Sequence, residues 1–150
     1  MLNIPIVIAA YNRKAPLERL LGSLRNAVYP AEVKLIISID GGTENDEIVN
    51  LANQFEWKHG EKQVIASEHN MGLRNHILKC GRLAKKYDGI ILLEDDLYVS
   101  PYFYTYVIQT QNVYRHDENI TGVALYSHQY NETACLPFKA IDDEFDVFFM

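Results

Sequence analysis

Three adjacent acids, Glu94-Asp95-Asp96, are the residues of this sequence best placed to do chemistry. They follow Leu93 at the end of the most apolar run in the chain, so a buried segment delivers three carboxylates to one place. Adjacent carboxylates repel one another and resist desolvation, and such perturbed clusters are often functional. A hard divalent cation relieves this repulsion, because Mg²⁺ or Mn²⁺ typically joins one or two carboxylates to substrate phosphates. The cluster therefore predicts a Mg²⁺ or Mn²⁺ site for a diphosphate, with a solvated acidic turn as the alternative.

Two other polar groups also follow apolar runs. Tyr11-Asn12-Arg13 comes directly after the first run, and Asp40 ends the second run just before Gly41-Gly42. A carboxylate after a strand is also a common turn former that bonds its own backbone, and this alternative stays open for Asp40. The sequence thus offers three polar ends, each delivered by an apolar segment.

The elements that carry these ends alternate between strand and helix patterns. Runs rich in β-branched residues predict strands, and stretches with apolar residues at helical spacing predict the helices between them. The strands are expected at 4–10, 33–39, 63–67, 89–93 and 120–126, with a loop over 127–143 and a last strand over 145–150. Such alternation predicts an α/β fold, with a mostly parallel sheet and helices on both faces. Because ligands bind outside the carboxyl ends of such strands, the three polar ends are expected to share one site.

Composition narrows the class of partner. The chain has 150 residues and a net charge of −6, with no run of Lys or Arg, so no nucleic acid partner is predicted. Cys80 and Cys135 lie in apolar stretches, which predicts buried thiols in a reducing compartment. No signal peptide or transmembrane segment is evident, so we expect a cytoplasmic protein. Because the last residues read as a strand, we also expect that the natural protein continues past Met150.

Other phosphate-binding and catalytic motifs are missing from the sequence. No G-x-G-x-x-G follows the first run, and no Gly-Lys-Ser/Thr or G-x-S-x-G motif occurs. Dinucleotide oxidoreductases, P-loop proteins and α/β-hydrolases are therefore disfavoured. A phosphoacceptor signalling domain is disfavoured as well, because Asn12 stands where that fold needs paired acids.

The polar segments resemble those of glycosyltransferases with the GT-A (Rossmann-like) fold. The segments 10–13 and 38–42 resemble the uridine-binding start of family 2 transferases. The segment 92–103 is closer to the Glu-Asp-Asp segment of the N-acetylglucosaminyltransferases that act on mannosides. The resemblance implies that 1–150 is the N-terminal, nucleotide-sugar-binding part of such a domain. It also implies transfer from a UDP-sugar to a glycan or other hydroxyl acceptor, with a non-catalytic binding module as the alternative.

The resemblance also suggests roles for individual residues. Asp96 would ligate the metal, and the segment 72–76 would supply a further donor contact. Arg74 there is equally well explained as a solvated helix residue. No residue is assigned as the catalytic base, since Asp142, Asp143 and Glu144 precede the last apparent strand; without a base the chain is expected to bind donor but transfer poorly. The donor-binding residues implied are Tyr11, Asn12, Arg13, Asp40, Arg74, Asn75, Glu94 and Asp95.

Overall fold

Four apolar runs form one parallel sheet in the computed structural model, which describes residues 2–42, 45–125, 130–131 and 136–137. Val7 pairs with Ile36 on one side and with Leu92 on the other. The two central strands are buried along their whole length, as parallel strands covered on both faces are. The sheet order is β3-β2-β1-β4, with strands β1 (Ile6–Ala10), β2 (Leu35–Ile39), β3 (Lys62–Ala66) and β4 (Ile91–Glu94).

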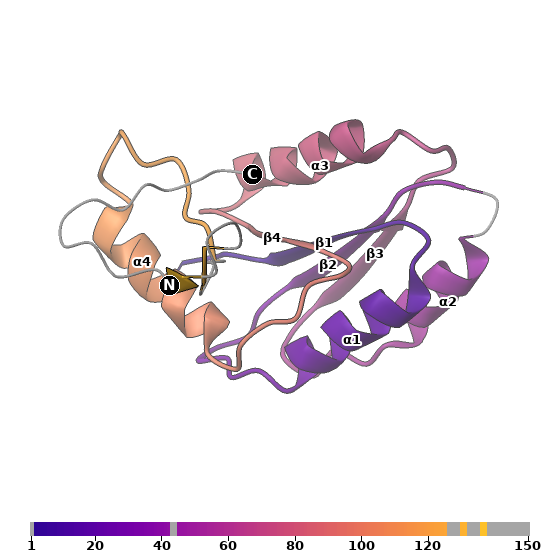
Figure 1. Ribbon diagram of the computed structural model, residues 1–150, viewed down its shortest axis with the longest axis horizontal. Coiled ribbons are helices and arrows are strands. Elements are labelled where there is room, and N and C mark those ends of the chain that lie inside the picture. Colours follow the sequence, from indigo (N-terminus) through magenta and orange to yellow (C-terminus); the bar gives the residue numbers. More distant parts are fainter. Residues whose placement is uncertain (1, 43–44, 126–129, 132–135, 138–150) are drawn as a thin grey trace. The chain divides into compact units, whose positions relative to one another are not determined.

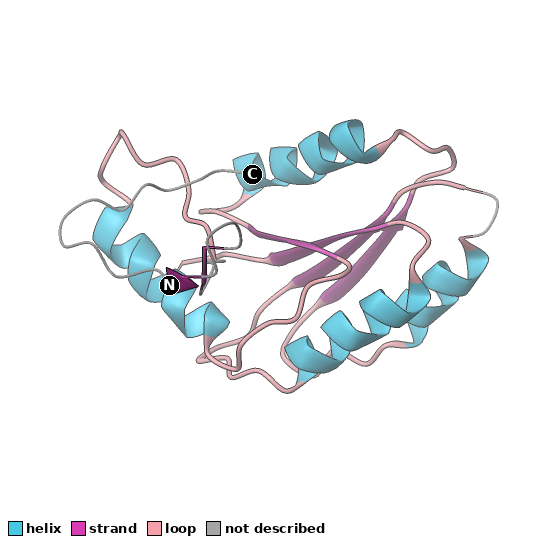
Figure 2. Cartoon of the chain, viewed as in Figure 1, coloured by secondary structure: helices cyan, strands magenta, loops and turns pink. Residues whose placement is uncertain are grey.

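Helices cover both faces of this sheet (Figure 1), which confirms the predicted α/β architecture. Helices α1 and α2 lie on one face and α3 on the other (Figure 2). On the α3 face, Cys80 packs against Val7, Ala9 and Ile36. On the opposite face, α1 buries four leucines at helical spacing, Leu17, Leu20, Leu21 and Leu24. The helices are α1 (Lys14–Arg25), α2 (Asp46–Gln54), α3 (Leu73–Gly81) and α4 (Phe103–Tyr114), and a 3₁₀ helix (Arg82–Lys86) follows α3.

The chain divides into two compact units, residues 1–106 and 107–150, and the sheet belongs to the first. In the second unit, two sequence predictions are wrong. Residues 120–125 form no strand, because an apolar run becomes a strand only where a neighbouring strand supplies hydrogen-bond partners. Within the predicted loop, β5 (Tyr130–Asn131) pairs antiparallel with β6 (Leu136–Pro137). The predicted strand over 145–150 lies outside the described residues.

The observed burial of side chains agrees in part with the burial predicted from the sequence. Cys80 is buried as predicted, whereas Cys135 lies outside the described residues. Phe103 and Tyr104 are buried, and the Tyr104 hydroxyl donates to the Ile4 carbonyl oxygen at 3.0 Å. Tyr102 and Tyr106 are exposed, so two of the four aromatic residues in 102–106 belong to the core. No helix in the described part of the chain has the length and apolarity needed to cross a bilayer.

Candidate functional site

The ends of β1 and β4 leave the sheet side by side. Ala9 of β1 pairs with Glu94 of β4, so the segments that follow these two residues emerge at the same edge. Tyr11–Arg13 continues from β1, and Asp95 and Asp96 continue from β4. The parallel register therefore brings together groups that are more than 80 positions apart in the sequence.

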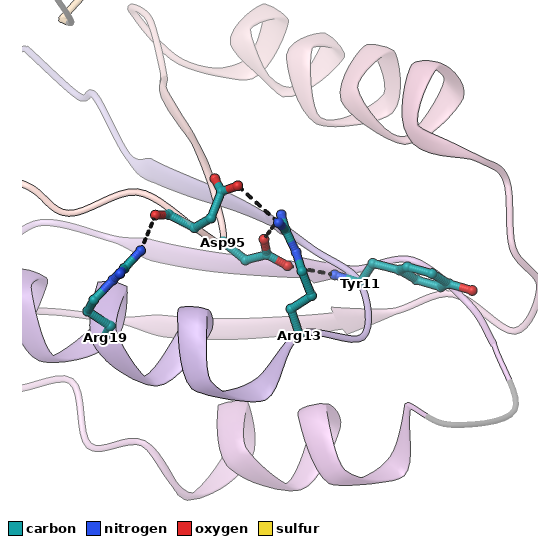
Figure 3. Close-up of polar contacts among 5 residues, drawn as sticks. Tyr11, Arg13, Arg19 and Asp95 are labelled. Atoms are coloured by element: carbon teal, nitrogen blue, oxygen red, sulfur yellow. Dashed lines mark hydrogen bonds and ion pairs between the residues drawn. The ribbon is translucent and has the colours of Figure 1, made fainter.

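Arg13 bridges the two aspartates that follow β4 (Figure 3). Its Nη2 contacts Asp95 Oδ1, and its Nη1 donates to Asp96 Oδ2 at 3.0 Å. The Asp95 side chain is only 3% exposed and also accepts from the Tyr11 backbone N–H at 3.3 Å, whereas the Asp96 side chain is 45% exposed. Arg13 therefore neutralises one buried and one open carboxylate at the same time.

A second arginine holds the same turn from the side of α1. Arg19 Nη2 donates to the backbone carbonyl oxygen of Asp96 at 2.6 Å (Figure 3). Arg19 is not among the predicted site residues, because an exposed arginine within a helix carries no signal for a contact so far along the chain. Residues 94–96, which we call the acidic turn, are thus fastened to the start of α1 by two cationic side chains. Arg13 bonds to two carboxylates, and Arg19 bonds to a backbone carbonyl oxygen.

Asp40, at the end of β2, has a different environment. It is 3% exposed, and its Oδ1 accepts from the N–H groups of Gly41 and Met71, both at 2.9 Å. Its Oδ2 accepts from the N–H of Gly72 at 3.1 Å. Gly41 permits this close approach, because a Cβ there would overlap the backbone of His69. Asp40 therefore fastens the loop before α3 to the end of β2, in keeping with its alternative role as a turn former.

Tyr11 connects the residues around Arg13 with the residues around Asp40. Its hydroxyl accepts from Asn70 Nδ2 at 2.9 Å, and Asn70 Oδ1 accepts from the Gly72 N–H at 2.7 Å. Gly72 has a positive φ of 77°, a conformation that glycine adopts readily. The expected meeting of the polar strand ends is thereby confirmed, whereas the role of each residue stays a prediction.

The other predicted donor-binding residues lie at the surface. The side chains of Asn12, Arg74 and Glu94 are exposed and form no hydrogen bond or ion pair with another described residue. Asn75, in the first turn of α3, donates from Nδ2 to the Met71 carbonyl oxygen at 2.9 Å. Asp142, Asp143 and Glu144 lie outside the described residues.

His76, the neighbour of Asn75, points into the interior instead. It is 3% exposed, and its Nε2 lies 2.8 Å from the Ser38 hydroxyl of β2. Burial lowers the pKa of His76, Asp40 acts in the opposite direction, and Lys79 adds to the lowering. The imidazole is therefore neutral near pH 7 and is part of the packing between α3 and the sheet.

Comparison with known proteins agrees with this geometry. A model of the family described as Glycosyl transferase family 2 matches residues 6–140. The crystal structure of S. aureus TarS 1-349 in complex with UDP aligns with 87% of this chain and 40% of that chain, at 16% identity and a TM-score of 0.59. A second crystal structure of S. aureus TarS 1-349 aligns with 81% of this chain and 38% of that chain, at 17% identity and a TM-score of 0.55. A search of curated protein sequences found no match.

These alignments confirm the predicted GT-A, Rossmann-like fold. The chain spans less than half the length of the TarS chains it matches. At such low identity the likeness to TarS shows the fold alone.

Proposed function

Because the chain belongs to glycosyl transferase family 2, we propose that it binds a UDP-sugar through a divalent cation and transfers the sugar to an acceptor hydroxyl. The acceptor is a glycan or another hydroxyl compound. Support for uridine comes from the aligned TarS structure that is a complex with UDP, and from the resemblance of segments 10–13 and 38–42 to uridine-binding segments. The resemblance of segment 92–103 to N-acetylglucosaminyltransferases that act on mannosides also supports a nucleotide-sugar donor.

The observation that carries the proposal is the meeting of the acidic turn with Tyr11–Arg13 at the carboxyl edge of the sheet. Parallel α/β sheets bind ligands at this edge. Arg13 and Asp96 are both partly exposed there, so a polar ligand can reach a cation and a carboxylate side by side. A diphosphate with its metal ion matches that pair of charges.

The chemistry of the side chains fits a cation that arrives together with its substrate. Mg²⁺ and Mn²⁺ prefer oxygen ligands, and Mg²⁺ usually keeps several waters and uses only one or two carboxylates. Among the described residues, no group of three or more His, Cys, Asp or Glu side chains could hold a metal ion. Asp96 is the exposed aspartate after β4, so it would be the main protein ligand and phosphate oxygens would complete the shell. A bound cation would stabilise the negative charge that develops on the leaving diphosphate.

The remaining residues bind and orient the donor. Tyr11 is 37% exposed and offers an aromatic surface beside Gly42 and Asn70 for the nucleotide. A direct contact between Asp40 and the nucleotide stays a prediction, because both Asp40 oxygens already accept backbone N–H groups. We propose that Asp40 acts on the donor by fixing the loop at Met71 and Gly72. No described residue is assigned as the base that takes the acceptor proton.

The proposal is tested by calorimetric titration of the protein with UDP in Mn²⁺ and in chelator. We expect UDP to bind at least about tenfold more tightly with Mn²⁺, because the cation offsets repulsion between the acidic turn and the diphosphate. Asp96→Asn removes the best anionic ligand while keeping its size, and should abolish this enhancement. Asp88→Asn makes the same change before β4 rather than after it, and this variant should keep the tighter UDP binding in Mn²⁺.

Equal UDP affinity of the wild-type protein in Mn²⁺ and in chelator would contradict the metal-dependent site. Release of UDP from a UDP-sugar only when a glycoside acceptor is present would identify a transferase. Binding without such release is the behaviour of the alternative, a non-catalytic nucleotide-sugar-binding module.

A further inference from the structure

We propose that Arg13 is a positioning residue that holds Asp96 in the nucleotide-free protein, and thereby makes cation binding depend on the nucleotide. This inference rests on the proposed function, in which Asp96 is the metal ligand. It adds a role for Arg13 before the donor arrives, when its guanidinium occupies the carboxylate that the cation needs.

The two carboxylates hold Arg13 unequally, and this asymmetry is the basis of the proposal. Asp95 is 3% exposed and has a second donor in the Tyr11 N–H, so its negative charge is buried and needs a permanent counter-ion. Asp96 is 45% exposed, and water can replace the guanidinium there at little cost. Arg13 is thus anchored on Asp95 and exchangeable on Asp96.

The geometry of the guanidinium suits this double contact. Different nitrogens of Arg13 reach the two aspartates, Nη2 to Asp95 and Nη1 to Asp96. The planar guanidinium carries several N–H donors in fixed directions, so one group can bond to two carboxylates. Figure 3 shows the side chain reaching across from the start of α1 to the acidic turn.

A cation without nucleotide therefore faces two obstacles at Asp96. It must displace the Arg13 N–H, and it must approach a positive charge that Asp95 keeps in place. A nucleoside diphosphate removes both obstacles, because its phosphate oxygens bind the cation and offer the guanidinium another anionic partner. Cation and nucleotide then each strengthen the binding of the other by the same factor.

The test measures Mn²⁺ binding by the electron paramagnetic resonance signal of free Mn²⁺, with and without UDP, so it needs no turnover. In Arg13→Gln, nucleotide-free Mn²⁺ affinity should rise about five- to tenfold, because the competing N–H and its charge are gone. The factor by which UDP strengthens Mn²⁺ binding should fall by a similar amount. Simple damage to the fold would lower the affinity, so a rise distinguishes the proposed role from a structural one.

Two further variants act as controls. Arg13→Lys keeps the positive charge and should stay within about threefold of the wild-type Mn²⁺ affinity. Arg25→Gln removes the same charge at the other end of α1, roughly 18 Å along the helix, and should change nothing. Unchanged or weaker nucleotide-free Mn²⁺ binding in a folded Arg13→Gln protein would overturn the inference, as would an equal rise in Arg13→Lys.

The outcomes separate the two proposals. If wild-type protein binds Mn²⁺ with UDP but Arg13→Gln shows no gain without UDP, only the role of Arg13 fails. If Mn²⁺ binds neither protein even with UDP, the metal site itself fails, and the role of Arg13 fails with it.

Discussion

Two acids that follow the strands on either side of β1, Asp40 after β2 and Asp96 after β4, look alike in the sequence and differ in the structure. Asp40 is 3% exposed, and its oxygens accept three backbone N–H groups, two of them from the loop before α3. Asp96 has a side chain that is 45% exposed and shares a single arginine with Asp95. The Asp40 carboxylate is buried and hydrogen-bonded to backbone N–H groups. The Asp96 carboxylate is exposed, so a ligand can replace its arginine partner.

The difference separates two tasks at one edge of the sheet. We call Asp40, Gly41 and the segment 69–76 that packs against them the closed region. This region fixes the path of the chain, because the hydrogen bonds from Met71 and Gly72 to Asp40 join segments far apart in the sequence. We call Arg13 and Asp96 the open region, because both charged side chains are exposed and a ligand can reach them. Substitutions in the closed region should therefore change stability most, and substitutions in the open region should change ligand binding most.

The largest effect is expected for Gly41→Ala in the closed region. A methyl group at Gly41 would overlap the backbone of His69, and backbone cannot move aside as a flexible side chain can. We expect a loss of about 3 kcal/mol in the free energy of unfolding, measured by urea titration.

Gly22→Ala is the matched control, since a Cβ at Gly22 has no neighbour within 4 Å and lies inside helix α1. It should stabilise the protein by up to about 1 kcal/mol. Equal stability of Gly41→Ala and wild type would show that the loop at His69 is not packed as described.

The second prediction applies one substitution to both regions. Asp40→Asn should lower the free energy of unfolding by about 2 kcal/mol, because its amide N–H₂ would face a backbone N–H donor where a carboxylate oxygen now accepts the hydrogen bond. Asp96→Asn should change it by less than about 0.5 kcal/mol, since an exposed ion pair contributes little. The same urea titration measures both, and equal losses would remove the distinction between closed and open carboxylates.

Local pattern was enough to predict the order of elements and the gathering of the polar strand ends. Runs such as 33–39 are apolar and β-branched, so they favour buried strands wherever they pair. Strand limits differed by one or two residues, as for β2, which begins at Leu35 rather than Val33. The run 120–126 shows the limit of this reasoning, because no local signal states whether a neighbouring strand is present.

The partners of each acid could not be predicted from the sequence. Asp40 bonds to N–H groups of Met71 and Gly72, and a backbone donor 31 or 32 residues away has no side-chain signature. The contact of Arg19 with the Asp96 carbonyl is likewise set by how α1 lies against the turn after β4. The sequence therefore predicts which carboxylates gather at this edge of the sheet, but not which of them remain exposed to solvent.

The smallest expected effect is a pH dependence confined to the closed region, through His76. Burial lowers the pKa of this histidine below its ordinary 6.5, so as the pH falls the unfolded chain takes up a proton before the folded chain does. The contribution of a neutral His76 to stability is therefore complete above pH 6.5 and declines below it, by at most about 1.4 kcal/mol per pH unit. Urea titrations at pH 7.5, 6.5 and 5.5 should show this decline in the wild type and a shallower one in His76→Gln, which keeps a hydrogen-bonding group near Ser38 but cannot titrate. The slope is the informative quantity, because His76→Gln can also lower stability uniformly, and parallel slopes in the two proteins would show that His76 is not held neutral by its burial between α3 and the sheet.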